Sequence, residues 1–168
     1  MSEAVERHTV AVLVDNEPGV LARVIGLFSG RGYNIESLTV AEVDRSDNLS
    51  RITIVTSGTR MIIEQIKAQL SRLVPVHKVH DLTDEGPYVE REMALIKVAG
   101  TGEPRIEALR LAGIFRAVVV DSTTESFVFE ITGSGDKLNA FIALMDPLGL
   151  VEVSRTGAAA IARGPGSF

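Results

Sequence analysis

The chain has 168 residues, of which 45% are hydrophobic and 23% charged, which suits one large globular domain or two small ones. Its formal net charge is −5 and it has no basic patch, so we do not expect a nucleic-acid partner. It contains no cysteine, which excludes disulfides, thiolate chemistry and cysteine-bound zinc and fits a reducing compartment.

The start of the chain, MSEAVERHT, is short and charged and lacks the apolar segment of a signal peptide. No run approaches the roughly 20 apolar residues that a membrane-spanning helix needs. We therefore expect a cytoplasmic protein without a membrane span.

Hydrophobic periodicity divides the first half of the chain into strands and helices. The expected elements are a strand at 8–14, a helix at 18–29, strands at 33–43 and 50–57, a helix at 59–73 and a strand at 74–82. Pro18 suits the first helical position because its missing N–H costs nothing there, and Gly30 and Gly32 are expected to end the helix. Pro75 marks the last strand as an edge strand.

A polar, turn-rich segment at 83–89 is expected to link a first domain at 1–82 to a second domain at 90–168. The second domain repeats the pattern, with strands at 90–99, 115–122 and 125–132, helices at 105–112 and 136–148, and a last strand within 150–163. The tail GPGSF is expected to be frayed.

Both halves therefore read as β-α-β-β-α-β, which predicts an α+β protein of two tandem ferredoxin-like domains. Each domain should have an antiparallel sheet with both helices on one face, and its other face should be solvated or covered by a partner. The repeat of about 80 residues indicates an internal structural duplication that rests on pattern alone.

The first candidate site lies between Asp15 and Thr39. The helix of this segment carries an apolar stripe formed by Val20, Leu21, Val24, Ile25, Leu27 and Phe28. We expect this helix to pack on the sheet, with its first turn and Asn34 together forming a small polar pocket. Asn16 and Asn34 can hydrogen-bond a small zwitterion, free N–H groups at the helix start can hold its carboxylate, and Gly19 permits close approach.

Simpler interpretations of the same residues remain open at this point. Asn16 can form a turn or cap the helix, with Gly19 as part of the turn. Asn34 can be a turn residue that adopts positive φ.

Other motifs point to structure rather than chemistry. His77 and His80 fall on opposite faces of a strand, so we expect no metal site, and His8 is expected at a strand edge. The glycines at 100–102 and 133–136 fit helix caps better than phosphate loops. No G-x-S-x-G or catalytic triad stands out, so we expect no catalytic centre.

The segment NEPGVLARVIGLFSGRGYNIESL, from Asn16 to Leu38, resembles the start of the regulatory (small) subunit of acetohydroxyacid synthase, also called acetolactate synthase. The resemblance continues through LSRITIV, VEREMALIKV and GDKLNAF and so covers nearly the whole chain. The first motif is long and specific, and it opens an ACT domain, a ferredoxin-like module that binds amino acids. The second half resembles the C-terminal ACT-like domain of the family.

This resemblance implies a non-catalytic subunit without a metal or cofactor of its own. Its partner, the catalytic subunit, carries thiamine diphosphate, Mg²⁺ and FAD. The small subunit raises the partner's activity and confers feedback inhibition by valine in branched-chain amino acid biosynthesis.

The resemblance also implies where valine binds. Two ACT domains pair side by side as a homodimer with one continuous sheet, and valine lies at their interface. By motif position the site is lined by Asn16, Gly19, Val20 and Leu21 of one chain and by Asn34 and Ile35 of the other, with Ala41 just below. The turn at 100–104 has no Asn, so we expect no second valine site, and the C-terminal domain is expected to contact the catalytic subunit instead.

Two other functions remain as alternatives, a free-standing amino-acid sensor of another pathway and a small enzyme with an unrecognised site. The sequence leaves open whether valine, leucine or isoleucine is the main effector. It also leaves open the stoichiometry with the catalytic subunit, the surface that docks on it, and whether a metal or nucleotide binds.

Overall fold

A computed structural model describes residues 3–168 of the chain, which form two compact units. The first unit runs to Val89 and also includes Ala158–Phe168, whereas the second unit is Glu90–Gly157. The expected limits of the first domain (1–82), the linker (83–89) and the second domain (90–168) therefore differ from the limits of the two compact units. The segment expected as a linker contains a short helix, α3 (Leu82–Glu85), whose first residue is buried, and the start of strand β5.

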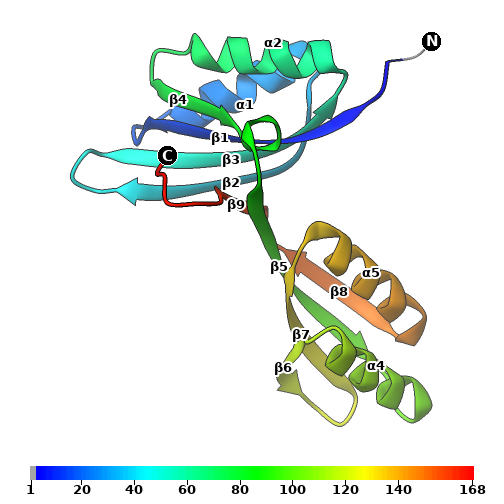
Figure 1. Cartoon of the computed structure of the whole chain (residues 1–168). Coiled ribbons are helices and arrows are strands. Elements are labelled where there is room, and N and C mark those ends of the chain that lie inside the picture. Colours follow the sequence, from blue (N-terminus) through cyan, green and yellow to red (C-terminus); the bar gives the residue numbers. More distant parts are fainter. Residues whose placement is uncertain (1–2) are drawn as a thin grey trace. The chain divides into compact units, whose positions relative to one another are not determined.

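The first unit has the predicted β-α-β-β-α-β order. Its elements are β1 (Glu6–Asp15), α1 (Val20–Arg31), β2 (Asn34–Asp44), β3 (Leu49–Gly58), α2 (Arg60–Ser71) and β4 (Val76–Asp81). The four strands form an antiparallel sheet in the order β2-β3-β1-β4, and α1 and α2 lie together over one face of it (Figure 1). The ferredoxin-like arrangement and the edge position of β4 are confirmed.

Alternate residues of the strands build the core of this unit. Val10, Val12 and Val14 of β1, Ile52 and Ile54 of β3, Val24 and Phe28 of α1 and Ile63, Ile66 and Leu70 of α2 are all buried. The predicted stripe of α1 is only partly in the core, because Leu21 and Ile25 remain 38% and 37% exposed. These two side chains lie four residues apart and so share one outer face of the helix.

The start of α1 differs from the prediction. The helix begins at Val20 rather than Pro18, and Gly19 precedes it with φ 85°. A left-handed φ is much easier for glycine than for residues with a Cβ atom, so the position of Gly19, rather than proline, decides where the helix starts. Gly32 (φ 68°) ends the helix as expected, whereas Gly30 lies inside it.

The second unit repeats the topology of the first. Its elements are β5 (Tyr88–Ala99), α4 (Glu103–Ile114), β6 (Val118–Ser122), β7 (Ser126–Gly133), α5 (Gly135–Met145), a 3₁₀ turn (Asp146–Leu148) and β8 (Leu150–Arg155). The strand order β6-β7-β5-β8 corresponds to β2-β3-β1-β4 of the first unit. Phe129 and Phe141 lie fully buried at its centre with ring centroids 6.0 Å apart. The predicted repeat of element order is confirmed.

The segment 158–168 packs on the first sheet instead of fraying. It contains a short strand, β9 (Ala159–Ala162), which pairs with β5. The Ala158 N–H donates to Ser37 Oγ (2.8 Å) and the Arg51 guanidinium donates to the Ala160 carbonyl (2.6 Å). Because Arg51 alternates with the buried Ile52, this contact lies on the helix-free face of the sheet. The chain therefore covers part of that face itself.

Candidate functional site

The loop after β1 is anchored by its backbone. The Asn16 N–H donates to the Asn48 carbonyl (2.8 Å), and the Asn48 side-chain amide donates to the Asn16 carbonyl (3.2 Å). The Asp15 N–H donates to the Pro75 carbonyl (2.9 Å), and Asp15 Oδ1 lies 2.6 Å from His77 Nε2. The loop is thus held from two neighbouring turns, which leaves the exposed Asn16 side chain available to a ligand.

The Asn16 side chain neither caps α1 nor forms a turn. The cap residue of α1 is Gly19, and within residues 3–168 no side chain accepts a hydrogen bond from the first turn. In the same part of the chain the N–H groups of Leu21 and Ala22 have no acceptor. The simpler interpretation of Asn16 is therefore wrong, and α1 begins with open backbone donors, which favour an anion.

Asn34 is the first residue of β2 and is not a left-handed turn residue. Its register partner is Ser57 of β3, its carbonyl accepts a hydrogen bond from Thr56 Oγ1, and its side chain is exposed. Ile35 is half-buried and contacts the core. Because β2 is an edge strand, its outer backbone groups are free to pair with another strand.

The two asparagines lie at opposite ends of the sheet. Asn34 is level with Ser57 and Arg7, whereas the loop of Asn16 follows Asp15, which is level with Leu49. The span from Leu49 to Ser57 along β3 is about 26 Å at roughly 3.3 Å per residue. The expectation that the first turn of α1 lies beside Asn34 is therefore wrong within a single chain.

Val20 and Leu21 differ in exposure at the start of α1. Val20 is 6% exposed and packs in the core, whereas Leu21 is 38% exposed and presents more apolar surface at this loop. Ala41 is exposed on β2, as is the loop itself from Asn16 to Gly19.

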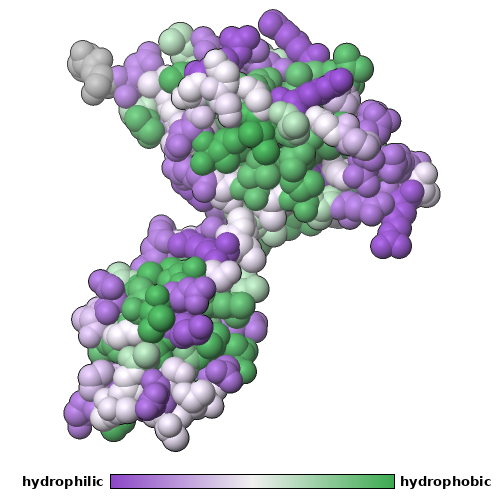
Figure 2. Space-filling model, turned by 180° about the vertical axis from the view of Figure 1, so that it is seen from behind, coloured by the Kyte–Doolittle hydropathy of each residue, from purple (hydrophilic) through white to green (hydrophobic). Residues whose placement is uncertain are grey.

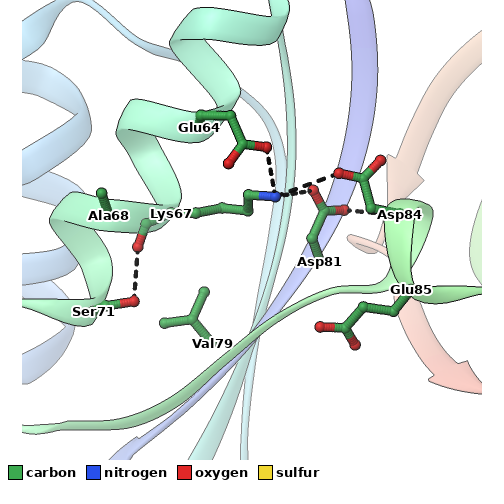
Figure 3. Close-up of a pocket in the computed structure, with 8 residues that line it drawn as sticks. All are labelled: Glu64, Lys67, Ala68, Ser71, Val79, Asp81, Asp84 and Glu85. Atoms are coloured by element: carbon green, nitrogen blue, oxygen red, sulfur yellow. Dashed lines mark hydrogen bonds and ion pairs between the residues drawn. The ribbon is translucent and has the colours of Figure 1, made fainter.

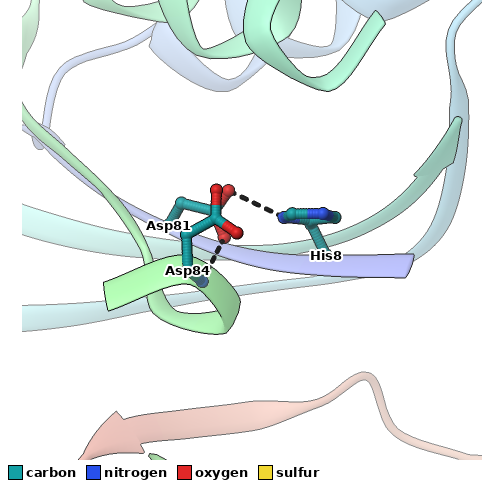
Figure 4. Close-up of side chains that lie close together, drawn as sticks. All are labelled: His8, Asp81 and Asp84. Carbon is teal, nitrogen blue, oxygen red and sulfur yellow. Dashed lines mark hydrogen bonds and ion pairs between the residues drawn. The ribbon is translucent and has the colours of Figure 1, made fainter. Parts of the chain in front are cut away.

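A group of three ionisable side chains, His8, Asp81 and Asp84, joins β1, β4 and α3 (Figure 4). His8 Nδ1 lies 2.8 Å from Asp81 Oδ2, and His8 Nε2 lies 2.7 Å from Glu6 Oε2. His8 and Asp81 are buried, and Asp84 lies close enough to complete a set of three potential metal ligands. The expectation of a strand-edge His8 is wrong because β1 is an inner strand, and sequence spacing gave no signal for this cluster.

Helix α2 supplies the cations of this cluster. Lys67 Nζ lies 3.2 Å from Asp81 Oδ2 and 3.4 Å from Asp84 Oδ2, and Arg60 Nη2 lies 2.9 Å from Asp84 Oδ2. The hydrogen bond from Arg60 lowers the pKa of Asp84 to about 2. The amino and guanidinium groups already neutralise these carboxylates. The cluster therefore fits a structural role, in which ion pairs hold α3 against α2, better than a metal centre.

An open pocket of about 360 Å³ borders this cluster (Figure 3). Its lining consists of Glu64, Lys67, Ala68, Ser71, Val79, Asp81, Asp84 and Glu85. Its charges pair with one another, as Lys67 does with Glu64 (2.9 Å), and Glu85 pairs with His80 (2.9 Å). It contains none of the predicted site residues.

The glycine-rich segments of the second unit act as helix boundaries, as predicted. Ser134 caps α5 by accepting from the Lys137 N–H (3.3 Å), and Gly102 (φ 68°) precedes α4. Among the described residues, no helix is long and apolar enough to cross a membrane.

The comparisons with known proteins cover both units. The family model "AHAS small subunit-like ACT domain" matches residues 10–78, and "Small subunit of acetolactate synthase" matches residues 91–164. The chain is 51% identical over 158 residues to a probable acetolactate synthase small subunit of Archaeoglobus fulgidus, covering 94% of this chain and 98% of that protein. It is 46% identical over 159 residues to the isozyme 3 small subunit of Escherichia coli, covering 94% and 96%.

A solved structure agrees with this similarity. The acetolactate synthase small subunit of Thermotoga maritima matches with a TM-score of 0.84 and 42% identity, covering 95% of this chain and 99% of that one. The chain thus belongs to the family of acetolactate synthase small subunits, the regulatory subunits of that enzyme, and its first unit is their ACT domain.

Proposed function

We propose that this regulatory subunit activates the catalytic subunit of acetolactate synthase and confers feedback inhibition by valine, which binds between two copies of its ACT domain. The observation that carries the proposal is the placement of Asn16 and Asn34 at opposite ends of one sheet whose β2 edge is open.

A two-fold axis beside β2 reverses one sheet relative to the other. Antiparallel pairing of β2 with β2 of a second copy then extends the sheet without interruption. In that arrangement the end of β2 near the Asn16 loop of one chain approaches the start of β2, at Asn34, of the other. We call each place where these two ends meet a corner. Each dimer has two corners, and each corner combines Asn16 of one chain with Asn34 of the other.

Exposed apolar side chains support this pairing. Leu21 and Ile25 of α1 are 38% and 37% exposed, and Val40 and Val43 of β2 are 43% and 52% exposed. Apolar surface also gathers over the first unit in the space-filling view (Figure 2). Such a patch beside an open strand edge is typical of a protein interface.

The chemistry of each corner suits a branched amino acid. The free N–H groups at the start of α1 bind the carboxylate, the amide oxygens of Asn16 and Asn34 accept from the ammonium, and Leu21 and Ile35 line an apolar slot. Discrimination against leucine rests on about one methylene, worth roughly 1–3 kcal/mol, so selectivity should be partial.

Regulation then follows from coupling between two interfaces. Valine favours one arrangement of the paired ACT domains, and that arrangement must contact the catalytic subunit differently for any inhibition to arise. A coupling of about 1–3 kcal/mol is typical. Acetolactate formation takes place on the catalytic subunit, which carries thiamine diphosphate, Mg²⁺ and FAD.

The test is reconstitution with the catalytic subunit. We expect this chain to raise acetolactate formation, to show no turnover alone, and to make the complex sensitive to added valine. Valine-insensitive activation would contradict the effector assignment, and turnover by the isolated chain would contradict a regulatory role.

A further inference from the structure

One residue of the β2–β3 hairpin holds the backbone of Asn16 from both sides. The Asn16 N–H donates to the Asn48 carbonyl (2.8 Å), and the Asn48 side-chain amide donates to the Asn16 carbonyl (3.2 Å). The two residues are 32 positions apart in the chain, so this contact depends on the fold of the sheet and not on a local turn. Asn48 thus engages both backbone polar groups of Asn16, whose side chain is exposed.

The backbone conformation of Asn48 makes this double contact possible. Asn48 is left-handed, with φ 54°. Asparagine adopts this conformation more readily than most residues that carry a Cβ atom. Glycine would adopt it as well, but glycine has no side-chain amide. An asparagine at this position therefore supplies both the turn and the hydrogen-bond donor.

The hairpin that precedes Asn48 is braced by its own hydrogen bonds. Asp44 Oδ1 accepts from the Ser46 hydroxyl (2.6 Å), the Ser46 N–H (2.9 Å) and the Asp47 N–H (3.2 Å). The bond from the Ser46 hydroxyl, together with those from the two N–H groups, lowers the pKa of Asp44 below its ordinary value, which keeps the carboxylate charged at neutral pH. Asn48 is therefore held at the end of a preformed turn.

The proposed effector site needs the backbone of Asn16 in a fixed place. Its ligand must contact the Asn16 side chain and the open N–H groups at the start of α1 at the same time, and the exposed loop residues 17–19 separate these groups. Groups that are already held at the correct spacing bind a ligand more tightly, because no loop has to be ordered on binding. The same hairpin closes the end of β2 that meets Asn34 of the second chain in the proposed dimer.

We infer that Asn48 is a positioning residue of the effector site, which holds Asn16 so that its side chain and the N–H groups of α1 face the ligand together. Asn48 acts through Asn16 and does not itself contact valine. This inference rests on the proposed function and adds to it a residue that sets the affinity for the effector.

Calorimetric titration of Asn48→Gly with valine tests the inference. Glycine keeps the left-handed backbone and the carbonyl and removes only the amide donor. Arg116→Gly is the matched control, because Arg116 (φ 60°) is the other non-glycine residue with positive φ among residues 3–168. We expect Asn48→Gly to weaken valine binding about three- to tenfold, the loss of one neutral hydrogen bond, and Arg116→Gly to leave it unchanged. Wild-type affinity in Asn48→Gly would overturn the inference.

A second variant separates the hydrogen bond from the shape of the side chain. Asn48→Asp keeps the shape and still tolerates a left-handed φ, but it places a carboxylate oxygen against the Asn16 carbonyl. We expect it to weaken valine binding at least as much as Asn48→Gly does. Wild-type affinity in Asn48→Asp would overturn the role given to the amide donor.

Two further measurements distinguish positioning from general stability. Both variants should activate the catalytic subunit as the wild type does, while the valine concentration for half-inhibition rises by the factor that calorimetry gives. Equal losses of activation and valine binding would overturn the inference in favour of a general structural role.

Hydrogen exchange of the Asn16 N–H reports on the loop in the absence of valine. We expect faster exchange in Asn48→Gly, because the loop opens more often without the amide contact, and unchanged exchange would overturn the inference. If the wild-type chain bound no valine while this exchange behaved as expected, the proposed function would fail, and the effector role of Asn48 with it.

Discussion

Asn16 follows strand β1 at one end of the ACT sheet, and Asn34 opens strand β2 at the other end. The strand positions level with them, Leu49 and Ser57, lie about 26 Å apart along β3, from a rise of roughly 3.3 Å per residue. A ligand the size of valine cannot span that distance. Joint action of the two residues therefore requires a second chain, which makes the dimer interface a condition of the proposed regulation.

We expect Asn16→Ala and Asn34→Ala each to weaken valine binding at least about tenfold, the loss that one charge-assisted hydrogen bond predicts. Both side chains are exposed, so the fold and the activation of the catalytic subunit should be retained. Calorimetric titration with valine measures the effect. Asn139→Ala, at an exposed asparagine of the second unit, is the control. Unchanged affinity in both site variants would contradict the site assignment.

Gly19→Ala should disturb the start of α1. Glycine adopts φ 85° freely, whereas a Cβ atom makes this conformation unfavourable by about 1–2 kcal/mol. No atom lies within 4 Å of the added Cβ, so the cost comes from the backbone and not from a clash. We expect a lower free energy of unfolding in urea together with weaker valine binding. Gly26→Ala, inside the same helix and equally free of neighbours, should be neutral or stabilising.

The buried His8 should make stability fall as pH rises. Burial alone would lower the pKa of His8, but its hydrogen bonds to Glu6 and Asp81 outweigh burial, so the pKa lies above its ordinary value of 6.5. A raised folded-state pKa gives stability that is fully present below pH 6.5 and is lost as the pH rises through the folded-state pKa. Urea unfolding between pH 5 and about 9 measures the slope of the free energy of unfolding against pH.

His8→Gln should flatten that slope, whereas His77→Gln, at an exposed histidine, should preserve it. An unchanged slope in His8→Gln would contradict the role of the buried cluster. At acid pH, Asp84 has the opposite effect on stability. Its pKa is lowered to about 2, so its contribution to the free energy of unfolding is present above pH 3.8 and is lost as the pH falls toward 2.

Arg51→Ala should release the segment 158–168 from the sheet. The guanidinium donates to the Ala160 carbonyl at 2.6 Å and its carbon lies 4.7 Å from the Phe168 ring centroid, and the two contacts together are worth about 1–3 kcal/mol. We expect faster proteolysis of this segment and a lower free energy of unfolding. Arg45→Ala, at a 91% exposed side chain, should change neither.

Periodicity sufficed for most of the fold. The predicted β-α-β-β-α-β order recurs in both units, because amphipathic elements must turn one face to the core. The start of α1 was misplaced, since the left-handed φ of Gly19 outweighed the preference of Pro18 for the first helical position.

Long-range contacts were beyond the reach of sequence patterns. The strand AAIA at 159–162 is too short for a periodic signal, and its attachment depends on Ser37 and Arg51, more than 100 residues earlier in the chain. The His8 and Asp81 pair likewise joins residues 73 positions apart. The resemblance predicts the site residues by motif position, but only the sheet register shows that Asn16 and Asn34 are far apart within a chain.

The most direct test of a shared site is complementation between two variants that each bind valine weakly. A mixed dimer of Asn16→Ala and Asn34→Ala chains has one corner with both substitutions and one corner with neither. Unfolding and refolding an equal mixture should restore about a quarter of the wild-type valine-binding capacity, because half of the dimers are mixed and each has one intact corner. A mixture that binds no more valine than either variant alone would contradict a site formed between two chains.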